Sequence, residues 1–198
     1  MDINTNSFWD NIDSEMWDEI AQLVILSVMT GIDNGILLLP NKARPFVDLE
    51  SIYDRVIEFA RTYRFSWIRG ITDATRQRVI SSITQWIRSG SPLSALESAL
   101  TPLFGEARAR RIAVTEITRL FARGNQMAWE DTGFINKVKW NTSQDDKVCP
   151  ICAPLDGTMI GIADIDALPP AHPNCRCWIS PVLDEQAFED KLDEILGL

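Results

Sequence analysis

Residues 149–177 read CPICAPLDGTMIGIADIDALPPAHPNCRC, and they hold every cysteine of the 198-residue chain together with its single histidine. The five candidate metal donors are Cys149, Cys152, His172, Cys175 and Cys177. A C-x-x-C turn points two thiolates at one tetrahedral metal ion, and a structural zinc ion takes four Cys or His ligands. The pattern therefore predicts a loop-rich module that folds around about one Zn²⁺ per chain. The preferred ligands are Cys149, Cys152, Cys175 and one of His172 or Cys177.

Other uses of the cysteine cluster stay open at this level. Two disulfide bonds are one alternative, although the N-terminus carries no secretory signal and thiols inside cells stay reduced. A thioredoxin-like use of Cys149 and Cys152 lacks the βαβ context that this redox motif normally has. Thiols without any ligand are the third alternative.

The motifs of several enzyme classes are missing. A zinc deaminase needs H-x-E ahead of its P-C-x-x-C segment, and an HNH-type nuclease needs more than one histidine, whereas the chain has only His172. The patterns H-E-x-x-H, G-x-x-x-x-G-K-[ST] and G-x-S-x-G do not occur. A nucleophile pair of His172 and Cys175 is disfavoured by the intervening Pro173 and by the expected metal role. We therefore expect no catalytic residues.

Working outward from the cluster, apolar residues recur at helical spacing on its N-terminal side. The expected helices cover residues 7–30, 49–68, 72–88, 92–103 and 106–130, with Gly31 ending the first helix and Asp33-Asn34-Gly35 forming a turn. Alternating stretches predict strands at 134–140, 158–162 and 177–183, before an acidic helix at 184–196. The expected fold is α+β and mainly α, with a helical N-terminal two-thirds followed by a small loop-rich β module clamped by the Cys/His cluster. The corresponding units are 1–104, 105–183 and 184–198.

The charge is unevenly distributed. The chain carries a net charge of −9, made of −7 over residues 1–41, +6 over 42–140, −3 over 141–183 and −5 over 184–198. The apolar fraction of 45% and the charged fraction of 24% exclude a wholly disordered chain. No uninterrupted apolar run reaches the roughly 20 residues that cross a bilayer, so no membrane association is expected. The basic middle either pairs with the acidic ends or faces DNA phosphates. The candidate DNA-facing residues are Arg108, Arg110, Arg119, Arg123, Lys137 and Lys139.

A series of motifs follows in order along the C-terminal half. They are Arg111-Ile-Ala-Val-Thr-Glu116, Ala122-Arg-Gly124, Gly133, Trp140, Asp145-Asp-Lys-Val-Cys149-Pro-Ile-Cys152, Leu155-Asp-Gly157 and Pro169-Pro-Ala-His-Pro-Asn-Cys-Arg-Cys177. In order and spacing, this series resembles the phage Mu F-like domain of phage minor head (head morphogenesis) proteins, over about residues 106–182. The resemblance implies a structural protein of the procapsid and virion without enzymatic activity.

The same resemblance implies partners and a location. Proteins of this family are built into the procapsid in a few copies near the portal vertex, so contact with the portal protein, the major capsid protein or a scaffolding protein is expected. The expected location is the capsid interior, and the host cytoplasm during assembly, with contact to packaged DNA and ejection with the genome as further expectations. With 15 residues after Leu183, the toxin or enzymatic extension of many members is not expected. The alternative function is a DNA-binding or metal-dependent, nuclease-like protein delivered with the genome.

Two further groups of residues have expected roles. The polar residues of the motifs are predicted to tie the long helix to the cysteine loops, or else to form a solvated helix face; they are Arg111, Thr115, Glu116, Asp145 and Arg176. Within this group, Glu116 is expected to meet Arg176, and Arg111 to meet Asp145 or backbone carbonyls. The apolar side of the helix at 7–30, with Trp9 and Trp17, is predicted to dock into a partner groove or to pack on its own domain.

Overall fold

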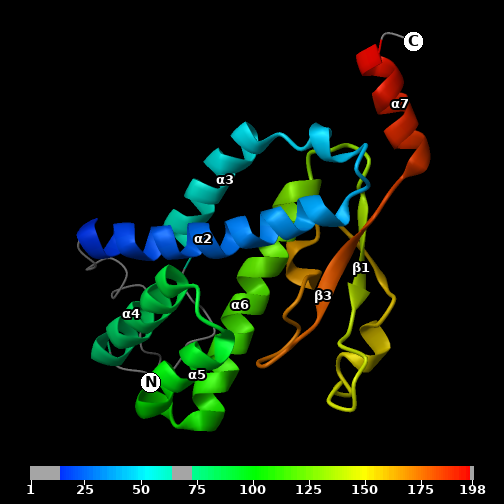
Figure 1. Ribbon diagram of the computed structural model, residues 1–198. Helices are drawn as coiled ribbons and strands as arrows, with labels where there is room; N and C mark the ends of the chain where they lie inside the picture. The colour runs from blue at the N-terminus through cyan, green and yellow to red at the C-terminus, as the bar shows by residue number, and fades with distance from the viewer. Residues whose placement is uncertain (1–13, 64–72, 197–198) are drawn as a thin grey trace.

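The long helix α6 (Glu106–Trp129) organises the chain, which we describe from a computed structural model for residues 14–63 and 73–196 (Figure 1). The helices that precede it are α2 (Ser14–Leu38), α3 (Leu49–Thr62), α4 (Asp73–Ser89) and α5 (Leu93–Phe104). The strands β1 (Lys137–Asn141), β2 (Met159–Gly161) and β3 (Trp178–Val182) follow it, and α7 (Glu185–Leu196) comes last. Short 3-10 helices lie at Arg44–Phe46, Ala153–Leu155 and Ile165–Ala167. The predicted α+β class, mainly helical with a small C-terminal β module, is confirmed.

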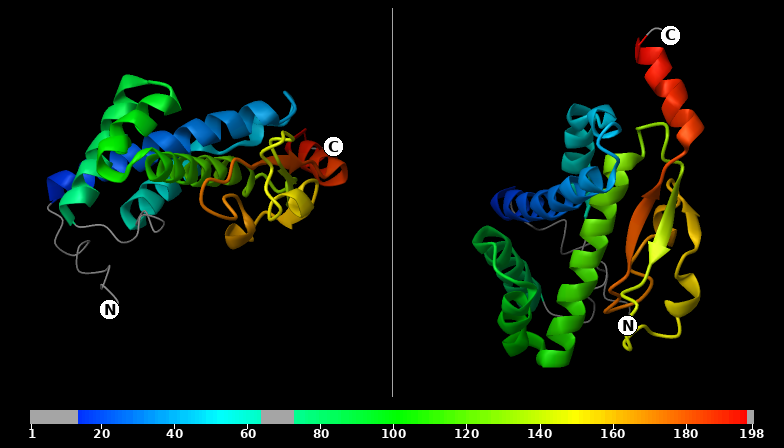
Figure 2. Two further views of the ribbon diagram at one scale, coloured as in Figure 1. Left: turned by 90° about the horizontal axis from the view of Figure 1, so that it is seen from below. Right: turned by 45° about the vertical axis from the view of Figure 1, so that its right-hand side comes forward.

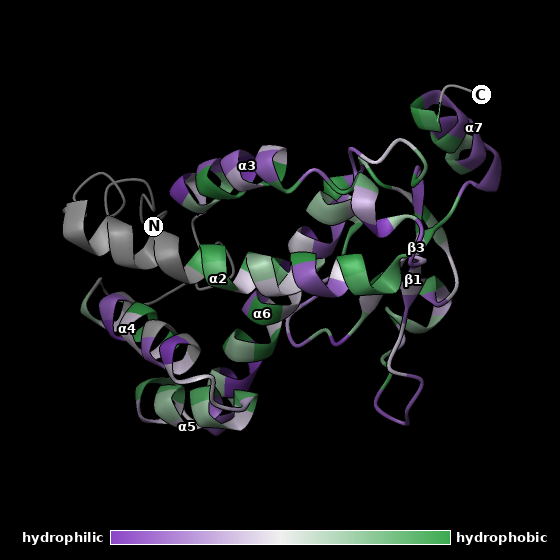
Figure 3. Ribbon diagram, turned by 45° about the horizontal axis from the view of Figure 1, so that its top comes forward, coloured by the Kyte–Doolittle hydropathy of each residue, from purple (hydrophilic) through white to green (hydrophobic). Residues whose placement is uncertain are grey.

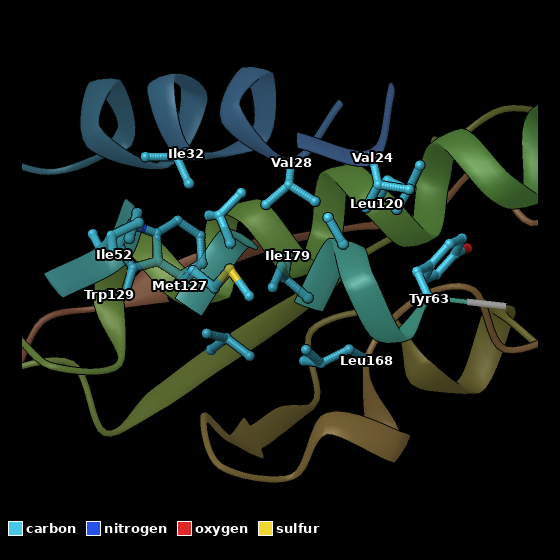
Figure 4. Close-up of a cluster of buried hydrophobic side chains, with 14 of the residues drawn as sticks. Val24, Val28, Ile32, Ile52, Tyr63, Leu120, Met127, Trp129, Leu168 and Ile179 are labelled. Atoms are coloured by element: carbon cyan, nitrogen blue, oxygen red, sulfur yellow. The ribbon is translucent and has the colours of Figure 1, made fainter. Parts of the chain in front are cut away.

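Helix α6 lies between the helices that precede it and the sheet (Figure 2). Helix α5 turns directly into α6 at Gly105, whose φ of 75° is a conformation that glycine adopts readily. Helix α2 crosses α6, and the apolar residues of both helices join those of α3 and the sheet in one core (Figure 4). The core thus runs across the boundaries predicted at residues 104 and 183, and it includes Phe188 of α7.

Helix α2 corrects the sequence prediction, because it continues to Leu38 through the turn expected after Gly31. A Cβ added at Gly124 of α6 would lie 2.8 Å from the Cα of Gly31, and one added at Gly35 would lie 2.9 Å from the Cβ of Ala128. Glycines in α2 therefore serve the close approach of two helices, and tertiary packing outweighs their low helix propensity.

Arg44 marks where α2 ends. Its Nε donates to the Leu39 carbonyl at 3.2 Å, and its Nη2 donates to the Leu37 carbonyl at 2.9 Å. These bonds satisfy carbonyl groups that lack a partner at the end of a helix. Pro40 lies two residues after Leu38, and a proline at this position prevents the helix from continuing. Residues 7–13, together with Trp9, lie outside the described part of the chain, as does the side chain of Trp17.

The sheet is antiparallel, in the order β2-β1-β3. Its register places Val138 opposite Ile160 and Pro181, and Trp140 opposite Ile179. Val138, Trp140 and Ile179 are buried, whereas Lys137 and Lys139 on the alternate positions of β1 are exposed. One sheet face is therefore packed and the other is open to solvent. Over the described residues, no helix combines the length and the apolar character that would cross a membrane.

Candidate metal centre

A tight turn after β1 brings the first two cysteines together. The backbone N–H of Cys152 donates to the Cys149 carbonyl at 3.1 Å and approaches the Cys149 sulfur at 3.4 Å. The N–H of Ala153 also donates to the Cys149 carbonyl, at 2.9 Å. The N–H groups directed at the Cys149 sulfur hold the pKa of this thiol below its usual value. The C-x-x-C segment therefore folds into a turn suited to presenting two sulfur ligands.

Helix α6 positions the second group of donors. The hydroxyl of Thr115 accepts from the backbone N–H of Asn174 at 2.7 Å, and the hydroxyl of Thr118 donates to the Cys175 carbonyl at 3.0 Å. Asn174 has a φ of 65°, a left-handed conformation that asparagine tolerates better than most residues. Two threonines one turn apart on α6 thus fix the loop that carries His172, Cys175 and Cys177.

The five donors form two overlapping triads that share Cys152. Within each triad, Cys149–Cys152–His172 or Cys152–Cys175–Cys177, all ligand atoms lie within 4.8 Å of one another. The His172 Nε2 atom is 3.1 Å from the Cys149 sulfur and 3.0 Å from the Cys152 sulfur, and the sulfurs of Cys152 and Cys175 are 3.8 Å apart. Ligand atoms of a tetrahedral zinc ion lie roughly 3.5–3.8 Å apart. The distance between the Cys152 and Cys175 sulfurs matches this spacing, and His172 Nε2 lies somewhat closer to its two sulfurs. Either triad could therefore hold a metal ion.

The ring of His172 is oriented for metal binding. Its Nδ1 lies 2.8 Å from the Pro173 carbonyl oxygen, which can only accept a hydrogen bond, so Nδ1 carries the proton. The lone pair of Nε2 is then directed toward the Cys149 and Cys152 sulfurs. A backbone acceptor that fixes the tautomer in this way is typical of a metal-bound histidine.

The buried thiols resist deprotonation by themselves. Burial raises the pKa of Cys177 to about 11 and raises that of Cys152 further. Trp140 packs against Cys152, Cys175 and Cys177 and keeps water away from them. A cavity of about 30 Å³ lies among the donors, enough for an ion or a water molecule. Buried cysteine sulfurs and an imidazole lone pair are ligands that a metal cation would bind, and such a cation would stabilise the thiolate form.

No disulfide bond joins these cysteines, all four of which are described. The 3.8 Å between the Cys152 and Cys175 sulfurs is far longer than the roughly 2.05 Å of a disulfide. The arrangement in the structure is thus one of four free thiols in two triads that share Cys152.

The polar cluster of the motifs is paired differently from the prediction. Arg176 makes a bidentate pair with Asp145, at 2.7 and 2.8 Å, which holds the pKa of this carboxyl below its usual range. The predicted contact between Glu116 and Arg176 is therefore wrong, as is Arg111 as the partner of Asp145. Arg111 is exposed, and its backbone carbonyl accepts from Thr115. Neighbouring positions on α6 point in different directions, so Thr115 faces the cysteine loop while Glu116 faces α3.

A buried pair that the sequence did not predict joins α3 to α6. The Tyr63 hydroxyl donates a hydrogen bond to Glu116, which is 1% exposed. Burial, followed by the nearby Glu116 charge, raises the pKa of Tyr63 well above its usual value. Nothing in a single sequence links Tyr63 to a glutamate 53 residues away.

Tyr63→Phe is expected to lower the free energy of unfolding by about 2 kcal/mol, because a hydrogen bond to a buried carboxylate is lost. Urea denaturation measures this change. Tyr53→Phe is the matched control, since Tyr53 is 49% exposed and its loss should change stability by less than about 0.5 kcal/mol. Equal effects of the two substitutions would show that the buried pair contributes little.

The six candidate DNA-facing residues lie in three different places. Arg108 and Arg110 are exposed near the start of α6. Arg119 and Arg123 line a cavity of about 420 Å³ with Phe59, Asp166 and Pro170, and Arg123 also contacts Gln126 and Glu130. Lys137 and Lys139 lie on the open face of the sheet. DNA contact through these residues stays a prediction.

Residues 77–180 are similar to a known protein family. The sequence model of the family described as "Phage Mu protein F like protein" matches residues 77–180, just over half of the chain. The curated "Uncharacterized protein YqbB" of Bacillus subtilis (strain 168) is 26% identical over 162 residues, which cover 72% of this chain and 53% of the relative. The chain therefore spans about half the length of the curated relative it matches. No solved structure gives a significant match.

Proposed function

Because this chain belongs to the Phage Mu protein F like family, we propose that it is a phage head morphogenesis protein, a structural part of the procapsid and virion at the portal vertex. The matched residues 77–180 contain the cysteine cluster and the helix that holds it. The observation that carries the proposal is the anchoring of the cysteine loops on Thr115 and Thr118 of α6, inside the matched region. These two hydrogen bonds tie the loop that carries Cys175 to the long helix.

The polar groups around the cluster have structural partners, which supports a role without catalysis. Asp145 is bound by Arg176, by the Ser143 hydroxyl and by the Lys147 N–H. The Nδ1 of His172 is bound to a backbone carbonyl. Asp156 accepts from both the N–H and the hydroxyl of Thr142. The carboxylates of this module therefore stabilise loops.

We further propose that the cluster binds one structural Zn²⁺, with Cys149, Cys152, His172 and Cys175 as ligands. His172 is favoured over Cys177 as the fourth ligand because its Nε2 lies about equally far from both sulfurs of the turn. Cys177 then stays a buried thiol beneath Trp140. When bound, the ion ties together two loops whose buried residues include few large aliphatic side chains.

Sedimentation of phage procapsids tests the head function. The chain is co-expressed with the portal and major capsid proteins of the phage that encodes it, and procapsids are separated on a gradient. We expect the chain to sediment with particles that contain portal and to be absent from particles assembled without portal. Equal binding to both kinds of particle would contradict the placement at the portal vertex, and absence from both would contradict the head function.

A further inference from the structure

Two separate segments of the chain carry the two halves of the donor set. Cys149 and Cys152 follow β1, whereas His172 and Cys175 lie on the loop that α6 holds by two hydrogen bonds. Residues 141–147, which lead from β1 to the first donor, are hydrophilic, as the loop that continues from β1 in Figure 3 shows. A metal ion that binds both halves therefore requires this hydrophilic segment to stay beside the loop that α6 holds.

A bidentate ion pair joins the two segments. Asp145 lies four residues before the first donor, and Arg176 lies between the last two cysteines. The Nη1 and Nη2 atoms of Arg176 donate to the two carboxylate oxygens of Asp145 at 2.7 and 2.8 Å. Residues 143–152 and 172–177 are all described, and apart from the contacts among the donors no other hydrogen bond connects these two ranges. The pair thus links the halves of the metal site without involving the metal.

The carboxylate of Asp145 is oriented by its own loop. Its Oδ1 atom accepts from the Ser143 hydroxyl at 3.2 Å and from the Lys147 N–H at 3.1 Å. A carboxylate held in this way loses little freedom when it binds a planar guanidinium, so the pair costs less side-chain entropy than most surface pairs. The side chains of Arg176 and Asp145 are 31% and 38% exposed, so dissolved salt reaches and screens the pair.

The residues that the pair joins also enclose the donors. Arg176 lines the cavity among the donors, and so do Ser143, Lys147 and Val148 of the segment that contains Asp145. Val148 packs against the buried cysteines and Trp140. Without the ion pair, the segment before Cys149 can move away from the second loop, which would separate the two halves of the donor set.

We propose that the Arg176–Asp145 pair positions the two halves of the metal site and thereby raises its affinity for Zn²⁺. This inference rests on the zinc site proposed above and adds two positioning residues that are not ligands. Groups that hold metal ligands in place commonly contribute about 10- to 100-fold to metal affinity, because the ion then meets ligands already in the required geometry.

A zinc titration of the whole chain in competition with a chromogenic chelator tests this role. Asp145→Asn keeps the Oδ1 acceptor for Ser143 and Lys147 but removes the charge, and Arg176→Gln removes the guanidinium. Each should weaken zinc binding about tenfold. The double variant should also be weakened about tenfold, and not about 100-fold, because both substitutions act through one pair.

Asp146→Asn is the matched control. It removes the same charge from the next residue, which is exposed and makes no hydrogen bond with Arg176. Its zinc affinity should stay within about threefold of the wild-type value. Salt gives a second measurement, since raising NaCl from about 50 to about 500 mM should weaken zinc binding more in the wild-type chain than in Asp145→Asn.

Three results would overturn the proposal while leaving the zinc site intact. They are single variants that bind zinc as tightly as wild type, a double variant that shows the product of the two single effects, and an equal salt dependence in wild type and Asp145→Asn. A wild-type chain that binds no zinc would instead overturn the metal site and this inference with it. Circular dichroism of each metal-free variant shows whether the helices remain folded, which is expected because the pair is partly exposed.

Discussion

Cys152→Ser is expected to release the metal and to unfold the cysteine loops while the helices remain folded. Cys152 is the one donor that belongs to both triads, so its loss disturbs every proposed ligand arrangement. Three of the buried residues of these loops are cysteines, so the sulfur ligands form a large part of the core of the module. Structural zinc supplies roughly 10–16 kcal/mol of apparent binding free energy in zinc-finger peptides, so we expect the module to lose about 3 kcal/mol or more.

Elemental analysis and limited proteolysis measure this result. Zinc content should fall from about one ion per chain to near none, and cleavage should appear within residues 143–177. A chelator added to the wild-type chain should reproduce both changes. A wild-type chain purified without chelator that contains no zinc would contradict the metal assignment.

Cys177→Ser is the matched control, because it removes a buried sulfur from the same loops without removing a proposed ligand. It should keep the zinc, whereas His172→Ala should lose it. The reverse pattern would show that Cys177 is the fourth ligand and that the position of His172 near both sulfurs is not coordination.

The sequence predicted those elements whose signals are local. Helices α4, α5 and α6 begin and end within about two residues of their predicted positions, because Pro92 and Gly105 mark the breaks between periodic stretches. The cysteine cluster was predictable for the same reason, since metal donors close in sequence need only a turn to converge. Thr115 shares this locality, because its place in the motif indicated that its face of the helix meets the loops.

What the sequence did not predict depends on contacts between distant residues. Tyr63 and Glu116 have no local signature, and only the packing of α3 on α6 brings them together. The wrong partner predicted for Arg176 has the same origin. The path of the loop that carries Asp145 determines which of several acidic residues pairs with Arg176. The number of charged residues in a sequence indicates that ion pairs form, but not which residues form them.

The continuation of α2 past Gly31 is the clearest example. Glycine and Asn34-Gly35 favour a turn locally, and a single sequence gives no sign that another helix will press against them. In the structure, Gly31 and Gly35 face Gly124 and Ala128 across the crossing with α6. The same residues that weaken the helix in isolation allow the two backbones to approach closely.

Gly124→Ala is therefore expected to lower the free energy of unfolding by about 3 kcal/mol or more, as measured by urea denaturation. A Cβ at this position would lie 2.8 Å from the Gly31 Cα, 2.9 Å from the Ile32 nitrogen and closer still to the Val28 carbonyl oxygen. All three are backbone atoms, which no side-chain rotation can move. Overpacking of this kind commonly costs about 1–3 kcal/mol, and more when the backbone itself must shift.

Whether Gly124→Ala lowers or raises the free energy of unfolding shows whether close helix packing or helix propensity dominates at this position. Within an exposed helix, replacing glycine with alanine stabilises by about 1 kcal/mol, so a helix crossing looser than the structure shows would make Gly124→Ala a stabilising substitution. Gly161→Ala is the matched control, because a Cβ there has no neighbour within 4 Å and the change should stay within about 0.5 kcal/mol. Destabilisation at Gly124 but not at Gly161 would establish that close packing against α6 keeps α2 helical across the turn-forming residues 31–35. Stabilisation at Gly124 would contradict that explanation.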